Sequence, residues 1–238
     1  MGRKPVLSVE KINKQFMLHT QNGAVLDVLR GISLSVYAGE IVALCGPSGA
    51  GKSSLLKAVY GTYRINGGRI VVRHGDDSTD VATASPRDIS ALRRNAIGYV
   101  SQFLRVIPRV PALDIVADPA IEQGVKPDDA RARATDLLLR LRIPGNLLNL
   151  SPLTFSGGEQ QRVNIARAMA APRPLMLFDE PTASLDPENR ATVLQMIAGL
   201  RDSGTAVLGI FHDPADRKIL GARDIDMATC GREEPVHA

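Results

Sequence analysis

The chain has 238 residues and a formal net charge of +4, since 29 Lys and Arg face 25 Asp and Glu. A hydrophobic content of 44% is enough for the interior of one sizeable α/β domain. Trp is absent, and the five Phe and four Tyr do not provide the stacking platforms of single-stranded nucleic-acid binders, so we expect no nucleic-acid partner.

The cysteines and the apolar runs bear on the compartment. Cys45 and Cys230 supply neither a disulfide framework nor a metal-ligand cluster, which favours a reducing, cytoplasmic location. No apolar run approaches the length of a membrane span, and the first residues lack the apolar core of an export signal. Val6 also breaks the N-terminal myristoylation pattern. We therefore expect any membrane contact to be made through a partner chain.

Hydrophobic periodicity indicates strands and helices along the chain. Early β-branched stretches predict an antiparallel sheet, and a later alternation of strand, helix and strand is typical of a parallel sheet. In the first half of the chain, we predict antiparallel strands within 5–16 and 28–46, a buried strand at 41–45, a helix at 51–61, a short strand and turn at 67–77, and a helix and a strand within 89–102. Helices follow from 111 to about 151 and include 127–143. The last predicted elements are a strand at 174–180, a helix at 188–202 and a strand at 205–213.

The strongest local motif is GPSGAGKS at 46–53, which follows a predicted strand and opens a predicted helix. Its glycines let backbone N–H groups surround phosphates, and the helix dipole favours their charge. We expect Lys52 to reach the β- and γ-phosphates of ATP and the Ser53 hydroxyl to bind Mg²⁺. The alternative is a glycine-rich turn with a surface lysine. The expected ATP-binding residues are Gly46, Pro47, Ser48, Gly49, Ala50, Gly51, Lys52, Ser53 and Ser54.

Two carboxylates end the apolar strand predicted at 174–180. Ligands bind at the carboxyl ends of strands in open α/β sheets. We assign Asp179 to the Mg²⁺ shell and Glu180 to the polarisation of the attacking water. Without the phosphate-binding motif, a helix cap or a solvated turn would be the usual interpretation of such residues.

A second glycine-containing motif, FSGGEQQRVNIARA, occupies 155–168. Ser156, Gly157 and Gly158 open its predicted helix, and a helix N-terminus with glycine amides is a second anion site. An ordinary N-cap followed by a glutamine-rich helix is the alternative.

In this order, the three motifs resemble those of the ATP-binding cassette (ABC) ATPases, and the resemblance covers nearly the whole chain. It implies roles for four further residues: Gln102 as the Q-loop amide that binds Mg²⁺ and senses the γ-phosphate and the lytic water, Asp186 in the D-loop, His212 as the switch histidine, and Phe16 as the aromatic that stacks on adenine. Without the resemblance, His212 would be an ordinary histidine and Phe16 a core residue. The 155–168 motif corresponds to the signature motif of this family. Its Phe155 and Glu159 depart from the Leu and Gln that are commonest at these positions.

The resemblance also implies an architecture and an activity. We expect an α/β P-loop NTPase fold of the ABC type, with a parallel core sheet, an N-terminal antiparallel β subdomain and an α-helical subdomain. Residues 1–238 would form one ABC ATPase domain, with 1–102 and 160–238 in the core and 103–159 in the helical subdomain. An active ATPase is expected, with ATP and Mg²⁺ as cofactors. It would form a head-to-tail dimer with itself or a related ATPase, in which Ser156, Gly157 and Gly158 close over the phosphate held by the other protomer's Lys52.

The stretch FLRVIPRVPALDIV at 103–116 follows Gln102. Arg105 and Arg109 lie between large apolar residues, and two prolines restrict the backbone. Apolar anchors with interspersed Arg are favoured at protein interfaces, so we predict a docking surface for a partner here. A buried connector with solvated arginines is the alternative.

Several longer stretches, VSQFLRVIPR, TFSGGEQQRVNIAR, FDEPTASLD and GIFHD, resemble the L subunits of bacterial carbon–phosphorus lyase systems. This implies an ATPase of phosphonate catabolism that is associated with ribosyl-phosphonate triphosphate synthesis, as a subunit of α-D-ribose 1-methylphosphonate 5-triphosphate synthase, and that has the lyase subunits as partners. The alternative is the nucleotide-binding subunit of a membrane transporter, because the generic motifs also resemble lipoprotein and macrolide exporter ATPases. A DNA-repair ATPase is disfavoured, because no long coiled-coil insertion separates the motifs.

Overall fold

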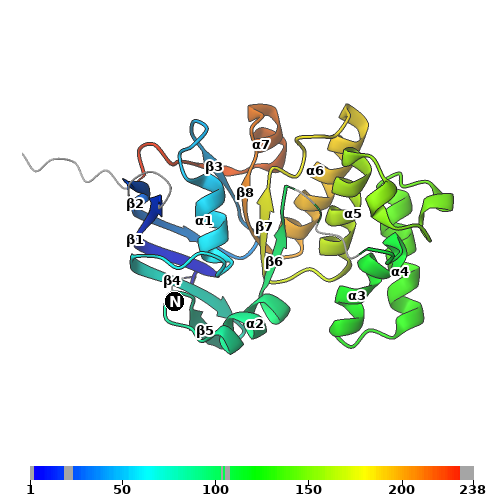
Figure 1. Cartoon of the computed structure of the whole chain (residues 1–238), viewed down its shortest axis with the longest axis horizontal. Helices are drawn as coiled ribbons and strands as arrows, with labels where there is room; N and C mark the ends of the chain where they lie inside the picture. The colour runs from blue at the N-terminus through cyan, green and yellow to red at the C-terminus, as the bar shows by residue number, and fades with distance from the viewer. Residues whose placement is uncertain (1–2, 19–23, 103, 105–107, 231–238) are drawn as a thin grey trace, which may run out of the picture.

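Two β-sheets form the framework of the chain (Figure 1). A computed structural model describes residues 3–18, 24–102, 104 and 108–230. The first sheet is antiparallel, with strand order β2-β1-β4-β5. Its strands are β1 (Leu7–Leu18), β2 (Ala24–Val36), β4 (Gly67–His74) and β5 (Asp77–Asp80).

The second sheet is parallel throughout, with strand order β6-β7-β8-β3-β9. Its strands are β3 (Ile41–Cys45), β6 (Ile97–Val100), β7 (Leu175–Asp179), β8 (Ala206–Ile210) and β9 (Arg223–Asp226). Every residue of β7 and β8 is buried, as expected for strands covered on both faces. Because the strands are parallel, the loops after β3, β6, β7 and β8 all leave from the same edge of the sheet.

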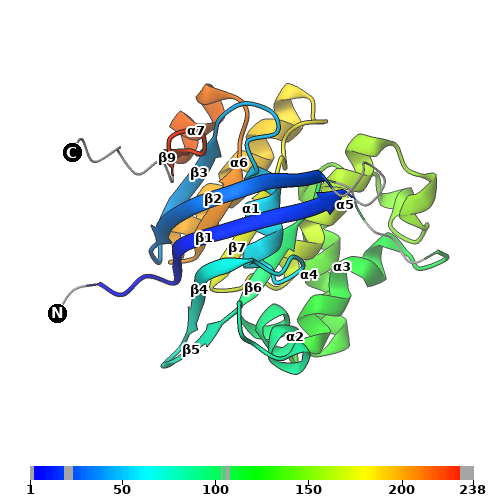
Figure 2. The same cartoon turned by 60° about the vertical axis from the view of Figure 1, so that its left-hand side comes forward.

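Helices cover both faces of the parallel sheet. On one side, α1 (Lys52–Val59) lies beneath the antiparallel strands (Figure 2). The other helices are α2 (Pro86–Asn95), α3 (Ala112–Glu122), α4 (Pro127–Arg140), α5 (Gly157–Ala170), α6 (Pro187–Asp202) and α7 (Pro214–Leu220), with 3₁₀ turns η1 (Gly145–Leu147) and η2 (Pro152–Thr154). The helices α3 and α4 lie at the end of the molecule farthest from the antiparallel sheet (Figure 1).

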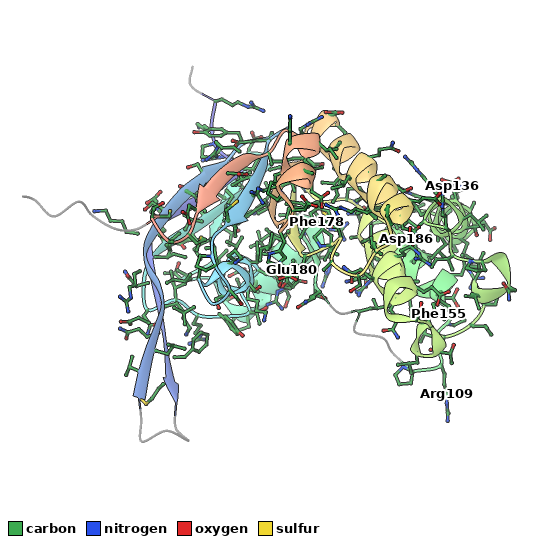
Figure 3. All side chains as sticks on the ribbon, turned by 90° about the horizontal axis from the view of Figure 1, so that it is seen from above. Arg109, Asp136, Phe155, Phe178, Glu180 and Asp186 are labelled. Carbon is green, nitrogen blue, oxygen red and sulfur yellow. The ribbon has the colours of Figure 1, made fainter. Side chains whose placement is uncertain are left out.

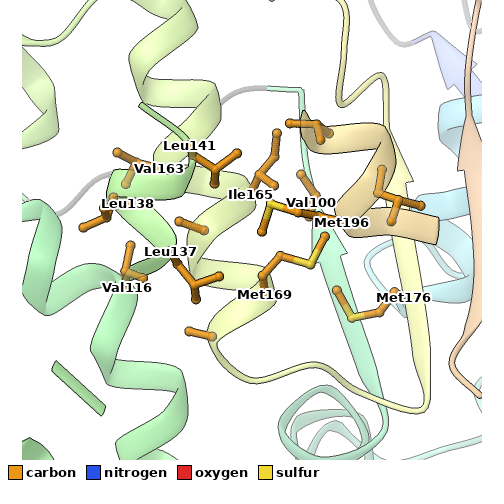
Figure 4. Close-up of a cluster of buried hydrophobic side chains, with 14 of the residues drawn as sticks. Val100, Val116, Leu137, Leu138, Leu141, Val163, Ile165, Met169, Met176 and Met196 are labelled. Atoms are coloured by element: carbon orange, nitrogen blue, oxygen red, sulfur yellow. The ribbon is translucent and has the colours of Figure 1, made fainter. Parts of the chain in front are cut away.

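Two apolar cores result from this arrangement. One joins the antiparallel sheet, α1 and one face of the parallel sheet. The other joins the opposite face of the parallel sheet to α3, α4, α5 and α6 (Figure 4). In this second core, Leu138 of α4 and Ile165 of α5 are fully buried, as is Val100 of β6. The helical end is therefore packed onto the sheet through α5.

The predicted α/β class, with an antiparallel sheet ahead of a parallel sheet, is confirmed. Sequence periodicity missed β5, α7 and β9. The β9 sequence, Arg-Asp-Ile-Asp, has no apolar run, and the strand is held by its backbone pairing to β3 at the sheet edge. The helical region after Pro111 is interrupted because Gly124, at φ 88°, ends α3 and Pro127 opens α4. Within the described ranges, no helix combines the length and hydrophobicity needed to span a bilayer.

Candidate nucleotide-binding and hydrolysis site

The loop between β3 and α1 is shaped by glycines. Gly46, Gly49 and Gly51 have φ values of 122°, 82° and 87°, which side-chain-bearing residues rarely adopt. A Cβ on Gly51 would also lie 2.6 Å from the Val28 carbonyl oxygen. The loop can therefore adopt this path only with glycine at position 51. Pro47, Ser48 and Gly49 are exposed on its outer turn, whereas Ser54 is half-buried in the first turn of α1.

Lys52 folds back over this loop. Its Nζ donates hydrogen bonds to the carbonyl oxygens of Gly46 and Pro47, both at 2.7 Å, and its side chain is buried. A buried ammonium requires such acceptors. An anion placed in the loop would be a stronger acceptor, because its full negative charge attracts the ammonium more strongly than a carbonyl dipole does.

Asp179, at the end of β7, has a partner for each carboxylate oxygen. Ser53 Oγ donates to Oδ1 at 2.9 Å, and Tyr99 Oη donates to Oδ2 at 2.8 Å. Asp179 is only 5% exposed, so both bonds replace lost hydration. Burial, and then the Asp179 charge, raise the pKa of Tyr99, which keeps its hydroxyl protonated as a donor.

These oxygens suit a Mg²⁺ ion that arrives with a nucleotide. Ser53, Gln102 and Asp179 line one cavity of about 490 Å³. No cluster of three or more His, Cys, Asp or Glu capable of holding a metal exists in the part of the chain that the structure describes. Mg²⁺ in phosphoryl-transfer sites takes one or two protein ligands and completes its shell with phosphate oxygens and water. The Ser53 and Asp179 pair fits that requirement.

Glu180 lies between two polar side chains, those of His212 and Gln102. Its Oε1 is 2.8 Å from His212 Nε2, and Gln102 Nε2 donates to its Oε2 at 3.3 Å. Glu180 has φ 54°, a left-handed conformation that is uncommon for a non-glycine residue. The carboxylate is thus held from both sides, and the Gln102 amide nitrogen is directed to it. The predicted Gln102–metal contact is not seen and stays a prediction.

Ser156, Gly157 and Gly158 of the signature motif lie at the N-terminus of α5. Ser156 is the N-cap, and its hydroxyl and backbone N–H both donate to Glu159 Oε2, at 2.7 and 2.8 Å. These bonds lower the pKa of Glu159. Gly158 lies against the loop before α6, since a Cβ there would approach the Ser184 carbonyl oxygen to 3.2 Å. In the described residues, no hydrogen bond joins 156–158 to the loop at 46–53.

In Figure 3, Phe155, which directly precedes Ser156, lies well away from Glu180. Asp186 is the N-cap of α6 and accepts from the Asn189 backbone N–H at 2.9 Å, which lowers its pKa. Ser53, Gln102 and Asp179 therefore share one cavity within a single chain, whereas Ser156, Gly157 and Gly158 do not line it.

Phe16 lies on β1, where its ring meets the Tyr63 ring edge-on at 5.2 Å. Lys14 Nζ lies 4.6 Å from the Phe16 ring centroid. Phe16 is half-buried, so part of its ring remains accessible. This geometry leaves the predicted adenine contact as a prediction.

The predicted docking stretch divides into buried and exposed parts. Leu104, Ala112 and Ile115 pack into the second core, so much of its apolar character serves the interior. Pro108 and Arg109 are exposed, and Arg109 lies at the outer end of the helical region (Figure 3). Arg105 lies outside the described residues. The description of the whole stretch as a surface was therefore wrong for its buried part.

Sequence reasoning missed two polar residues on buried faces. Tyr99 contacts Asp179, and Asn164 of α5 donates to the Ser101 carbonyl oxygen at 2.8 Å, next to Gln102. A tyrosine in an apolar strand, and an asparagine between Val163 and Ile165, were the available signals, since a buried polar group usually has a specific partner.

Comparisons with known proteins identify what this arrangement is similar to. The ABC transporter family profile matches residues 29–183. The lipoprotein-releasing system ATP-binding protein LolD of Maricaulis maris is 43% identical over 209 residues, which is 87% of this chain and 88% of that protein. The macrolide export ATP-binding/permease protein MacB of Brucella melitensis is 37% identical over 242 residues, covering 100% of this chain but only 36% of that protein.

A solved structure is similar over nearly the full length. The ATP-binding cassette MJ0796, in a dimeric post-hydrolysis state bound to ADP and Pi, aligns with a TM-score of 0.84 at 28% identity, covering 98% of this chain and 99% of that one. The relatives contradict the prediction of a carbon–phosphorus lyase subunit, and with it the predicted synthase role and lyase partners, because they are named as transport-system ATP-binding proteins. They favour the transporter alternative.

Proposed function

The chain belongs to the ABC transporter family, and we propose that it is the ATP-hydrolysing subunit of a membrane transporter. It has the ABC ATPase fold and binds ATP with Mg²⁺, as such domains do. The observation that carries the proposal is the position of Glu180. Gln102 and His212 hold its carboxylate, and it directly follows Asp179, which accepts a hydrogen bond from Ser53.

The chain's own residues then have distinct roles in hydrolysis. Lys52 would exchange its two loop carbonyls for the β- and γ-phosphates. Ser53 and Asp179 would hold Mg²⁺, which supplies charge neutralisation on the phosphates. Glu180 would accept a proton from the attacking water, with His212 and Gln102 fixing its carboxylate.

We also propose a head-to-tail dimer with itself or a related ABC ATPase. Ser156, Gly157 and Gly158 of one protomer would complete the phosphate site at Lys52 of the other, near Asp186. The separation of Phe155, next to Ser156, from Glu180 within one chain supports this arrangement, as does the dimeric state in which the similar MJ0796 was solved. A helix N-terminus with free amides suits the charge of a γ-phosphate.

Two finer assignments are part of the same proposal. Phe16 would stack on adenine, and residues 1–238 would form one ABC ATPase domain, with 1–102 and 160–238 in the core and 103–159 as the helical subdomain. The half-buried ring of Phe16 and the position of α3 and α4 at one end of the molecule support them.

The membrane partner would dock at the helical end, where Arg109 is exposed. The test is fractionation of cells that express the tagged chain with its transporter partner. We expect the wild type to sediment with membranes and Arg109→Glu to shift to the supernatant. Lys218→Glu, the same charge change at an exposed position of α7, is the matched control and should stay with the membranes. Recovery of the wild-type chain entirely in the supernatant would contradict the transporter assignment.

A further inference from the structure

Tyr99 Oη lies 2.8 Å from Asp179 Oδ2, and we propose that this hydroxyl is a positioning element of the metal site, which holds the Asp179 carboxylate in the orientation that receives Mg²⁺ with ATP. The inference rests on the proposed function, in which Asp179 belongs to the metal site. It adds a residue from a neighbouring strand that none of the sequence motifs contains.

The strand register explains why a tyrosine at this position reaches Asp179. Tyr99 of β6 is paired with Leu177 of β7 in the parallel ladder. Side chains two residues apart on a strand share a face and lie about 6–7 Å apart, so Asp179 follows Leu177 on that face. The long phenol side chain of Tyr99 covers this distance along the strand direction. A shorter polar residue at position 99 would not.

The ring of Tyr99 is held by contacts that do not involve its hydroxyl. It packs on the Tyr60 ring with 5.0 Å between centroids, and the Arg93 guanidinium lies 4.5 Å from the Tyr60 centroid. Arg93 Nε also donates to the Tyr60 carbonyl oxygen at 3.0 Å, which anchors the whole stack. A phenylalanine would keep this packing, so the particular contribution of tyrosine is the bond to Asp179.

The bond determines how Asp179 presents its other oxygen. With Oδ2 fixed by Tyr99, rotation of the carboxylate is restricted, and Oδ1 stays beside the Ser53 hydroxyl. Ser53 is the second residue that we assign to the metal. The hydroxyl of Tyr99, which lines the same cavity, would therefore set the spacing of these two oxygens without being a metal ligand itself.

The test compares Tyr99→Phe with the wild-type full chain, using Mn²⁺ as the metal probe. Electron paramagnetic resonance would measure Mn²⁺ affinity in the presence of ATP, and calorimetry would measure ATP affinity in EDTA. We expect Mn²⁺ binding to weaken about five- to tenfold, as the loss of one hydrogen bond predicts, while metal-free ATP affinity is unchanged. Tyr60→Phe, on the other ring of the stack, is the control and should leave both affinities unchanged.

A second comparison asks whether Tyr99 acts through Asp179. In an Asp179→Asn background, Tyr99→Phe should cause no further loss of Mn²⁺ affinity, and an additive loss would overturn the inference. Equal loss of metal-free and metal-dependent binding would overturn it too, because that is the result of a purely structural role. If the wild type binds Mn²⁺ with ATP and Tyr99→Phe has the same Mn²⁺ affinity, this inference alone is overturned. If the wild type shows no metal-dependent ATP binding, the proposed function is overturned as well.

Discussion

His212 Nε2 lies 2.8 Å from Glu180 Oε1, which links the segment after β8 to the end of β7. The two residues follow the carboxyl ends of neighbouring parallel strands, β7 and β8, so the sheet itself brings them together. Glu180 is 22% exposed and His212 is 59% exposed, so water can reach the pair while the carboxylate is still held.

The histidine should therefore contribute to hydrolysis rather than to binding. We expect His212→Ala to lower the rate of ATP hydrolysis by roughly 10²-fold, the range in which general acid–base contributions begin, with ATP affinity retained. His74→Ala, which removes a histidine bonded to Thr79 far from this site in β4, is the control. Steady-state hydrolysis and equilibrium ATP binding measure the two effects, and a loss of binding without a loss of rate would refute the assignment.

Gly51 should be the least replaceable residue of the phosphate loop. Gly51→Ala combines a strained φ with a clash against the Val28 carbonyl, whereas Gly49→Ala has a similar φ and open space around its Cβ. We expect Gly49→Ala to cost about 1 kcal/mol of unfolding free energy and Gly51→Ala distinctly more. Urea unfolding of both variants provides the comparison, and equal stabilities would show that the clash is relieved at no cost.

Asp216 should stabilise the region behind the hydrolysis site. It is 1% exposed, accepts from Arg190 Nε at 2.8 Å and from Thr182 Oγ1 at 3.0 Å, and Arg190 also pairs with Asp213. Removing Asp216 takes this buried acceptor from Arg190 Nε and Thr182 Oγ1, although Arg190 keeps Asp213, so Asp216→Ala should cost roughly 3 kcal/mol in urea unfolding.

The matched comparison is the exposed ion pair of Arg142 and Glu188. Arg142→Ala should cost less than about 1 kcal/mol, because exposed pairs are weak. If the two variants unfold at the same urea concentration, Asp216 has no special structural role.

The lowered pKa of Glu159 predicts that the stability of the fold depends on pH. Its pKa is lowered in the folded chain by the bonds from Ser156, so its charge stabilises the fold above the ordinary glutamate value and this contribution disappears as the pH falls through the lowered pKa. The difference in unfolding free energy between wild type and Glu159→Gln should be constant near neutral pH and should shrink below about pH 4. Urea unfolding between neutral and acidic pH measures it, and a difference that does not change with pH would contradict this cause.

The parts of the site that sequence could predict are those encoded locally. Gly51, Lys52 and Ser53 follow from spacing alone, because one turn and one helix start position them. The fold class also followed from periodicity, whereas β9 did not, because an edge strand of Arg-Asp-Ile-Asp carries no apolar pattern.

The parts that could not be predicted depend on strand order. Tyr99 meets Asp179 across a separation of 80 residues only because β6 pairs with β7. The contact of His212 with Glu180 likewise depends on β8 lying next to β7, and the family resemblance implied only that His212 is the switch histidine. The prediction of a carbon–phosphorus lyase subunit was wrong for a different reason. It concerned the partner of the ATPase, and the named relatives favour a transport system.

The central claim, that this chain hydrolyses ATP with Glu180 as the group that activates water, is tested most directly by ATP hydrolysis of the purified chain with its partner. Glu180→Gln should lower the rate by at least about 10²-fold while ATP binding is retained. Glu188→Gln, on the exposed surface of α6, should match the wild type. An unchanged rate for Glu180→Gln would contradict the account.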